Sequence, residues 1–141
     1  MKTTKINHLG IAVHDIETTR QVYEAMGLEI TEIMDVPEQK VRVAFIPIGE
    51  STIELVQPTT PDSTVAKYME RRGPGLHHLA LEVEDIQQSL SELEGQGSRL
   101  IDKTPRQGAE GRIAFLHPKS TGGVLIELVE PKTDSEKGET A

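Results

Sequence analysis

The sequence predicts an α+β fold in which two tandem βαβββ modules form one cupped mixed β-sheet around a metal site. The first observation is a self-alignment at a spacing of about 70 residues, which matches "INHLGIAVHDI" (6–16) to "LHHLALEVEDI" (76–86). The second is the tetrapeptide IELV, which occurs in "TIELVQP" (52–58) and again in "LIELVEP" (125–131). Repetition at this spacing indicates a duplicated structural unit.

Each module begins with a strand followed by a helix. The segments "INHLGIAV" and "LHHLALEV" are rich in Ile, Leu and Val, which is typical of strands. Asp15 and Asp85 lie two residues after the ends of these segments and stand where the N-cap of a helix belongs. Gly27 and Gly97 come after the helical patterns and fit the C-terminal ends of these helices.

The remainder of each module predicts strands. The linking segment "PTTPDSTVAKYMERRGPG" (58–75) predicts a short helix over 62–72, capped by Asp62 or Ser63. The expected strands lie near 28–34, 40–48 and 51–57 in the first module, and near 99–103, 111–117 and 123–130 in the second.

These segments define one domain over 1–131. It consists of module one (5–58), a linker with a short helix (59–74) and module two (75–131). The tail 132–141 is polar and has too few apolar residues to pack, so we expect it to be mobile.

Composition limits the classes of function. At 141 residues the chain is long enough for one hydrophobic core, and 35% apolar with 27% charged residues is ordinary for a globular protein. The net charge of -8 argues against nucleic-acid or membrane-surface partners. The chain has no cysteine, so thiol chemistry and zinc–thiolate sites are excluded. It contains neither a spanning apolar run nor a signal-peptide core, so we expect a cytoplasmic location.

Two histidines and two glutamates recur at matching positions of the modules. His8 aligns with His78, and Glu54 of the first IELV aligns with Glu127 of the second. Because side chains alternate between the faces of a strand, His8 shares its face with small residues such as Gly10, which leave space. The glutamates point away from their isoleucine and leucine neighbours. A buried carboxylate is costly unless its charge is compensated, so the repetition calls for a common cause.

This donor set predicts a site for a divalent ion such as Co, Zn, Mn or Ni, whose charge would compensate the carboxylates. A single histidine or glutamate on a strand is more often structural, but four such residues in register favour a metal site. His77 is expected to face away from His78, as a core or hydrogen-bonded histidine, and His14 to lie on a surface loop. The predicted ligands are His8, Glu54, His78 and Glu127.

The paired pattern resembles the vicinal oxygen chelate superfamily and, within it, the methylmalonyl-CoA epimerase family. The resemblance spans 5–130 and rests on "INHLGIAV", "PEQKVRVAF", "STVAKYMERRGPGLHHLAL" and "FLHPKSTGGVLIELVEP". It implies a metal, cobalt by preference, that grips two neighbouring substrate oxygens. The implied reaction interconverts (2R)- and (2S)-methylmalonyl-CoA by proton transfer through a metal-stabilised enolate. It also implies a homodimer and a role in propionate metabolism.

The resemblance assigns Glu127 as metal ligand and catalytic base. Some members carry a further glutamate that fits the position of Val43, together with a glutamine at that of Glu54. Because this chain lacks the first carboxylate, our hypothesis is that Glu54 is both ligand and second base, facing Glu127 across the metal. Alternatively, Glu54 only ligates, and a water or another acid completes the transfer.

Two rival functions remain open. A glyoxalase I-like lyase would use the same four ligand types on a glutathione hemithioacetal. Non-catalytic small-molecule binders of the same fold also exist, although they typically lack the full set of histidines and glutamates. The stretches "LHHLAL" and "HPKSTGGVLIELV" favour the epimerase.

Overall fold

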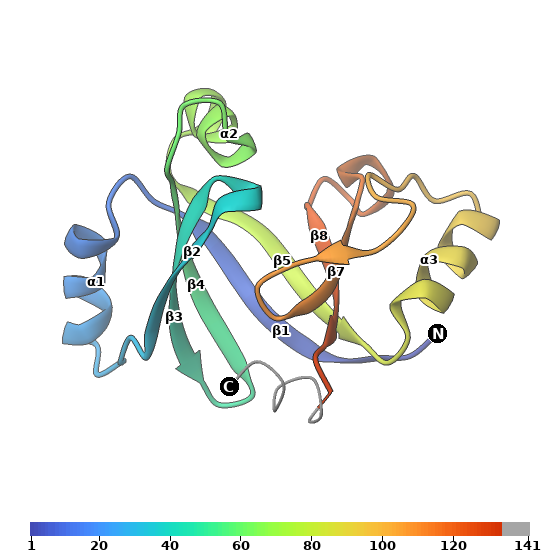
Figure 1. Cartoon of the computed structure of the whole chain (residues 1–141), viewed down its shortest axis with the longest axis horizontal. Coiled ribbons are helices and arrows are strands. Elements are labelled where there is room, and N and C mark those ends of the chain that lie inside the picture. The colour runs from blue at the N-terminus through green and yellow to red at the C-terminus, as the bar shows by residue number, and fades with distance from the viewer. Residues whose placement is uncertain (134–141) are drawn as a thin grey trace. The chain divides into compact units, whose positions relative to one another are not determined.

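The structure is a computed structural model that describes residues 1–133; the part of the predicted mobile tail over 134–141 lies outside the described residues. Three α-helices and eight strands make up the described chain (Figure 1). Their bounds are β1 (Thr3–Ala12), α1 (Ile16–Ala25), β2 (Glu32–Val36), β3 (Val41–Ile48), β4 (Ser51–Pro58), α2 (Thr64–Arg72), β5 (Gly75–Val83), α3 (Ile86–Gly95), β6 (Arg106–Gln107), β7 (Gly111–Leu116) and β8 (Ile126–Pro131).

The strands form a mixed sheet in the order β2-β3-β4-β1-β5-β8-β7-β6, which confirms the predicted fold class. In each module the first strand pairs in parallel with the last, β1 with β4 and β5 with β8, while the remaining neighbours within a module are antiparallel. The chain divides into two compact units, His8–His78 and Met1–Asn7 together with the chain from Leu79. Each unit is described by itself below.

In the unit His8–His78, α1 covers one face of the sheet. Ile16 packs with Val13, Ala44, Ile46 and Leu55 in a buried cluster. Two side chains accept hydrogen bonds from amides of the first turn of α1, which have no acceptor within the helix. The Asp15 carboxylate accepts from Thr18 N at 3.1 Å, as predicted for an N-cap, and Gln57 Oε1 accepts from Ile16 N at 2.8 Å.

The second unit repeats this arrangement around α3. Asp85 accepts a hydrogen bond from Gln88 N at 3.0 Å, and Glu130 accepts from Ile86 N at 3.2 Å. Gly97 follows the helix with φ of 89°, and Gly27 follows α1 with φ of 88°. This left-handed conformation explains why glycine ends both helices. The core cluster beneath α3 contains Val83, Ile86, Leu90, Ala114, Leu116, Ile126 and Leu128.

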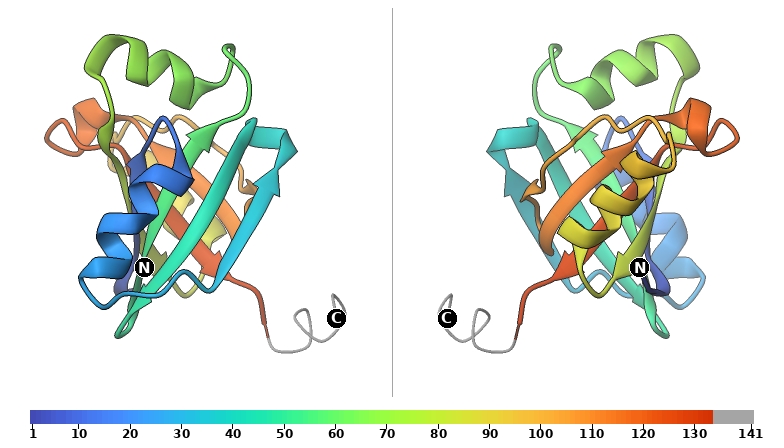
Figure 2. Two further views of the ribbon diagram at one scale, coloured as in Figure 1. Left: turned by 90° about the vertical axis from the view of Figure 1, so that its left-hand side faces the viewer. Right: turned by 90° about the vertical axis from the view of Figure 1, so that its right-hand side faces the viewer.

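Helix α2 begins at Thr64, directly after its N-cap residue Ser63. Ser63 is buried and accepts a hydrogen bond from Ala66 N at 2.9 Å, so it, rather than Asp62, is the N-cap. Asp62 accepts from Thr60 and pairs with Lys40 instead. Figure 2 shows α2 beyond the ends of the strands that it connects, β4 and β5. No helix among residues 1–133 has the length and apolar character needed to span a membrane.

Three of the predicted strands differ from the structure; the one expected near 123–130 begins only at Ile126. The strand expected over 28–34 begins only at Glu32. The strand expected over 99–103 is wrong: this stretch forms no regular strand but makes a bridge from Leu100 to Leu116 and backbone hydrogen bonds such as Ile101 N to Phe115 O at 2.9 Å, and the strand β6 follows it. The reason is local, because the Asp102 carboxylate accepts from Phe115 N at 2.9 Å and so takes the place of a backbone partner.

Candidate metal centre

Strands β1 and β4 place His8 and Glu54 on the same face of the sheet. The strands pair in parallel, with Gly10 opposite Glu54, while the next residue of β4, Leu55, enters the core on the other face. His8 is 2% exposed and Glu54 is 5% exposed. Their side chains meet, with Nδ1 of His8 3.1 Å from Oε2 of Glu54. The imidazole of His8 and the carboxylate of Glu54 are therefore in direct contact.

His78 on β5 presents its ring to the other nitrogen of His8. The two Nε2 atoms are 3.0 Å apart, and the ring planes are nearly perpendicular, at 89°. A Cβ atom added to Gly10 would lie 2.1 Å from Cε1 of His78. The small residues were expected to leave open space beside the histidines. At Gly10 this is wrong, because the ring of His78 fills the space.

His77 supports His78 from the side. Nδ1 of His77 is 2.9 Å from Nδ1 of His78, which confirms His77 as a hydrogen-bonded histidine, although it does not turn away from its neighbour. Burial lowers the pKa of His77 to about 4. Burial, followed by the charges of His8 and His77, holds the pKa of His78 well below its usual range. Both rings are therefore neutral at pH 7, and neutral imidazole is the form that binds a metal.

Glu127 occupies the equivalent place in the other unit. It is 5% exposed and stands opposite Ala80 in the parallel pair of β5 and β8, as Glu54 stands opposite Gly10. Its neighbour Leu128 enters the core beneath α3. Its antiparallel partner is Phe115, just as that of Glu54 is Phe45. Each unit thus carries one buried carboxylate in the same structural setting.

Val43 is buried on β3, with 4% of its surface exposed. It pairs with Val56, and Phe45, two residues along β3, pairs with Glu54. Alternation along the strands therefore puts Val43 on the face that carries Glu54. An apolar side chain occupies this position, beside the carboxylate.

The unit His8–His78 brings together three of the four predicted site residues: His8, Glu54 and His78. Glu127 belongs to the other unit. His77 was not predicted to belong to the site, and Gly10 was expected to lie beside open space. The adjacent histidines in "LHHLAL" could have indicated that His77 supports His78. The contact of Gly10 with His78 could not be read from the sequence, because the two histidines His8 and His78 that meet there are 70 residues apart.

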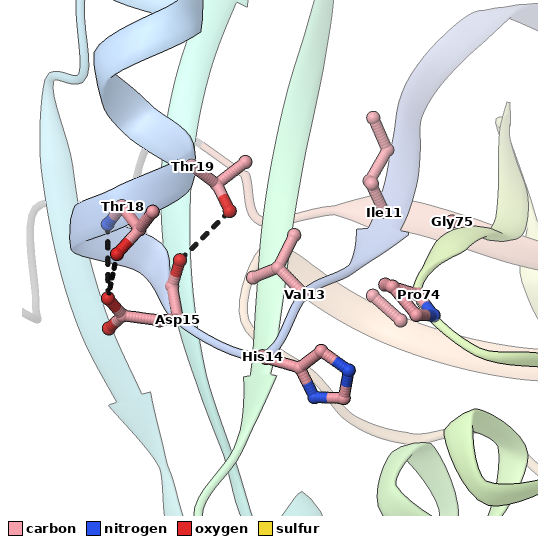
Figure 3. Close-up of a pocket in the computed structure, with 9 residues that line it drawn as sticks. Ile11, Val13, His14, Asp15, Thr18, Thr19, Pro74 and Gly75 are labelled. Carbon is pink, nitrogen blue, oxygen red and sulfur yellow. Dashed lines mark hydrogen bonds between the residues drawn. The ribbon is translucent and has the colours of Figure 1, made fainter.

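A cavity of about 520 Å³ lies where β1 ends and α1 begins (Figure 3). Ile11, Val13 and Pro74 line it with apolar surface, and His14 lies on its exposed rim as predicted for a loop residue. The carboxylate of Asp15 is bonded to Thr18, and these hydrogen bonds lower its pKa. Asp15 therefore serves the helix. Alternation along β1 puts Ile11 and Val13 on the face opposite His8.

Comparison with known proteins identifies the family. Residues 7–116 match the model of the glyoxalase/bleomycin resistance protein/dioxygenase superfamily. The uncharacterized protein YqjC of Bacillus subtilis is 46% identical over 92% of this chain and 94% of its own length. The ethylmalonyl-CoA/methylmalonyl-CoA epimerase of Cereibacter sphaeroides is 37% identical over 88% of this chain and 96% of its own.

A solved structure agrees with these sequence matches. A variant of the Streptomyces coelicolor methylmalonyl-CoA epimerase in complex with 2-nitronate-propionyl-CoA is 38% identical, with a TM-score of 0.89 over 94% of this chain and 97% of that one. The lactoylglutathione lyase of Arabidopsis thaliana is more distant, at 27% identity, and the chain spans 43% of it. This chain belongs to the glyoxalase/bleomycin resistance protein/dioxygenase superfamily and, within it, to the methylmalonyl-CoA epimerase enzymes.

Proposed function

We propose that this enzyme interconverts (2R)- and (2S)-methylmalonyl-CoA by a 1,1-proton transfer. The observation that carries this proposal is the similarity to epimerase structures over nearly the whole chain, one of them in complex with methylmalonyl-CoA. The proton that moves lies between a thioester and a carboxylate, so its removal leaves an enolate. Return of a proton to the opposite face inverts the centre, which requires acid–base groups on both faces or one mobile group.

The donor set fits a divalent cation. His8 and His78 direct Nε2 atoms to within 3.0 Å of one another, and the buried carboxylate of Glu54 lies beside Nδ1, the other ring nitrogen of His8. We propose His8, Glu54, His78 and Glu127 as the ligands, with cobalt first and zinc, manganese or nickel as alternatives. A cation held there would supply Lewis-acid stabilisation of the negative charge that develops on the thioester oxygen.

Glu127 is the proposed catalytic base. Phe115 is its cross-strand partner, and Ala80, Ile113 and Val129 form a buried cluster with Phe115. This setting limits the access of water to a proton that the carboxylate has taken. An abstracted proton is then retained for return to the substrate carbon more readily than on an exposed carboxylate.

Glu54 is the proposed second base. Its position relative to Gly10 and Phe45 repeats that of Glu127 relative to Ala80 and Phe115, so duplication of the module supports a matching role. Oε2 of Glu54 lies 3.1 Å from Nδ1 of His8. To take a proton from substrate, Glu54 would use its other oxygen or exchange this contact. If Glu54 only ligates the metal, a water or another acid completes the transfer.

The experiment that tests the function is a substrate comparison with metal analysis. Purified protein is stripped with a chelator, reloaded with Co²⁺, and assayed with methylmalonyl-CoA and with methylglyoxal plus glutathione. The proposal expects turnover of methylmalonyl-CoA that depends on the metal. Preferential turnover of the hemithioacetal would make the enzyme a glyoxalase I-like lyase. Failure to retain a stoichiometric ion, with neither activity, would favour a non-catalytic binder.

The proposed partners are an acyl-CoA substrate and a second copy of the chain. Val22 and Met26 leave apolar surface exposed on and just after α1, at 63% and 61% of their areas, in keeping with a covered face in a homodimer. Light scattering on a size-exclusion column should give twice the chain mass of 15.5 kDa, and a monomer over the whole accessible concentration range would contradict the dimer.

A further inference from the structure

The two ring nitrogens of His78 have two different histidines as partners. Nε2 faces Nε2 of His8 at 3.0 Å, and Nδ1 faces Nδ1 of His77 at 2.9 Å. The rings of His77 and His78 are nearly perpendicular, at 88°, so the nitrogens approach edge to edge rather than through stacked faces. His78 is buried, with 7% of its surface exposed, so water competes little for these contacts.

The chemistry of imidazole gives the second contact a direction. A neutral imidazole that offers the Nε2 lone pair to a metal carries its proton on Nδ1. Two nitrogens 2.9 Å apart share a single proton, so one donates and the other accepts. When Nε2 of His78 is a ligand, the donor is therefore Nδ1 of His78 and the acceptor is Nδ1 of His77.

We propose that His77 is a positioning residue: it accepts the Nδ1 proton of His78 and thereby holds that ring with its Nε2 lone pair free for a divalent ion. The inference rests on the metal site of the proposed function. It assigns His77 no contact with substrate or metal. Partners of this kind, behind a ligating histidine, typically change metal affinity by 10- to 100-fold when they are removed.

Helix α2 fixes the orientation of His77. The ring of Tyr68 meets that of His77 edge-on, with centroids 4.8 Å apart and planes at 87°. The hydroxyl of Tyr68 donates to the carbonyl of Leu76 at 2.9 Å, which ties α2 to the beginning of β5. The guanidinium of Arg72 lies over the ring of Tyr68, 5.9 Å from its centroid. The support of His78 thus runs through His77 to a helix that contributes no ligand.

In the first module a different group contacts Nδ1 of the histidine. Nδ1 of His8 has the carboxylate of Glu54 as its partner. Asn7 occupies the place that aligns with His77, and its side chain donates to Glu82 at 2.9 Å. The two ligating histidines are therefore held by different groups, a carboxylate for His8 and an imidazole for His78. This asymmetry is the reason that His77 is needed in the second module alone.

The test compares binding of Co²⁺ alone to the metal-free full chain by calorimetry. His77→Phe keeps a ring beside Tyr68 but removes the acceptor, so the dissociation constant should rise at least 10-fold. His77→Asn places an amide oxygen at the same branch point and should restore the affinity to within about 3-fold of the parent. His14→Phe, on an exposed loop, is the matched control and should leave the affinity unchanged. Thermal unfolding of each variant separates loss of affinity from loss of fold.

A second measurement, on the parent protein, tests the inference even if His77→Phe fails to fold. In the zinc-loaded parent, nitrogen-15 NMR should show His78 protonated at Nδ1, with a proton that exchanges slowly because His77 accepts it. Rapid exchange of that proton, or a folded His77→Phe that binds Co²⁺ as tightly as the parent, would overturn the inference while leaving the metal site intact. A parent that binds no divalent ion would instead refute the metal site, and with it this role.

Discussion

The imidazole ring of His78 occupies the space in which a side chain of Gly10 would stand. A Cβ atom at Gly10 would lie 2.1 Å from Cε1 and 2.5 Å from Nδ1 of that ring, far inside van der Waals contact. Gly10 lies on β1, two residues after His8, and the aligned residue of the second module is Ala80. The glycine is therefore a requirement of the site, since it lets the second histidine approach the first.

Gly10→Ala should weaken metal binding more than it weakens the fold. The added methyl group would push the His78 ring away from His8, because Nδ1 and Nε2 of the ring also lie within 2.6 Å of its position. We expect at least a 10-fold loss of Co²⁺ affinity by calorimetry. Gly95→Ala is the matched control, since nothing lies within 4 Å of its added Cβ and alanine favours the helix by about 0.5–1 kcal/mol. Equal affinities of the two variants would contradict the account.

Glu127→Gln should abolish epimerisation more completely than Glu54→Gln. An amide keeps the shape and an oxygen donor for a metal, but it cannot take a proton at neutral pH. For Glu127→Gln we expect a fall in kcat of at least 100-fold, in line with the usual contribution of a general base. For Glu54→Gln the loss should appear mainly with one stereoisomer. Glu70→Gln, on the exposed surface of α2, controls for the loss of a charge. Parent rates in both directions for Glu54→Gln would rule out Glu54 as a base.

Gln57→Ala and Glu130→Ala should each destabilise one module, because each removes a hydrogen bond to the first amide of a helix. Each removes the acceptor for the first amide of a helix, Ile16 N or Ile86 N, which then lacks this partner. We expect about 1 kcal/mol for Gln57→Ala. The cost at Glu130 should be somewhat larger, because its carboxylate also binds Arg112 with two nitrogens at 3.0 and 3.1 Å. Urea unfolding measures both, and Glu130→Gln should recover part of the loss.

The metal-free protein should lose stability as the pH falls from about 6.5 to 4. The folded-state pKa of His77, about 4, is depressed from an ordinary value of 6.5, so the unfolded chain binds a proton in this window that the folded chain does not. His78 shifts in the same direction. Stability is therefore full above pH 6.5 and falls by up to about 3 kcal/mol on approach to pH 4. His77→Asn should flatten the profile of unfolding free energy, and an unchanged slope would contradict this origin.

Duplication explains how much of the fold and site was predictable. The repeated IELV fixed the places of Glu54 and Glu127, and the aligned strands fixed those of His8 and His78, because equivalent residues take equivalent positions in a duplicated sheet. The helix caps could also be predicted, because Asp15 and Asp85 accept hydrogen bonds from amides only three residues away.

The features that escaped prediction depend on contacts that sequence patterns do not encode. The strand expected over 99–103 failed because one side chain, Asp102, satisfies the backbone of Phe115. The approach of His78 to Gly10 depends on the rotamer of a ring on another strand. The role of His77 follows from which nitrogen of His78 it meets, and alternation along a strand had suggested the opposite direction.

The central claim is that the enzyme moves the α-proton of an acyl-CoA between two faces of one carbon. Proton NMR in D₂O, with Co²⁺-loaded enzyme removed before each spectrum, would follow that hydrogen in (2R)- and (2S)-methylmalonyl-CoA separately. The account predicts that either isomer is converted to a mixture of both and acquires solvent deuterium at the α-carbon. Persistence of each isomer, with its hydrogen retained, in the presence of metal-loaded, folded enzyme would contradict it.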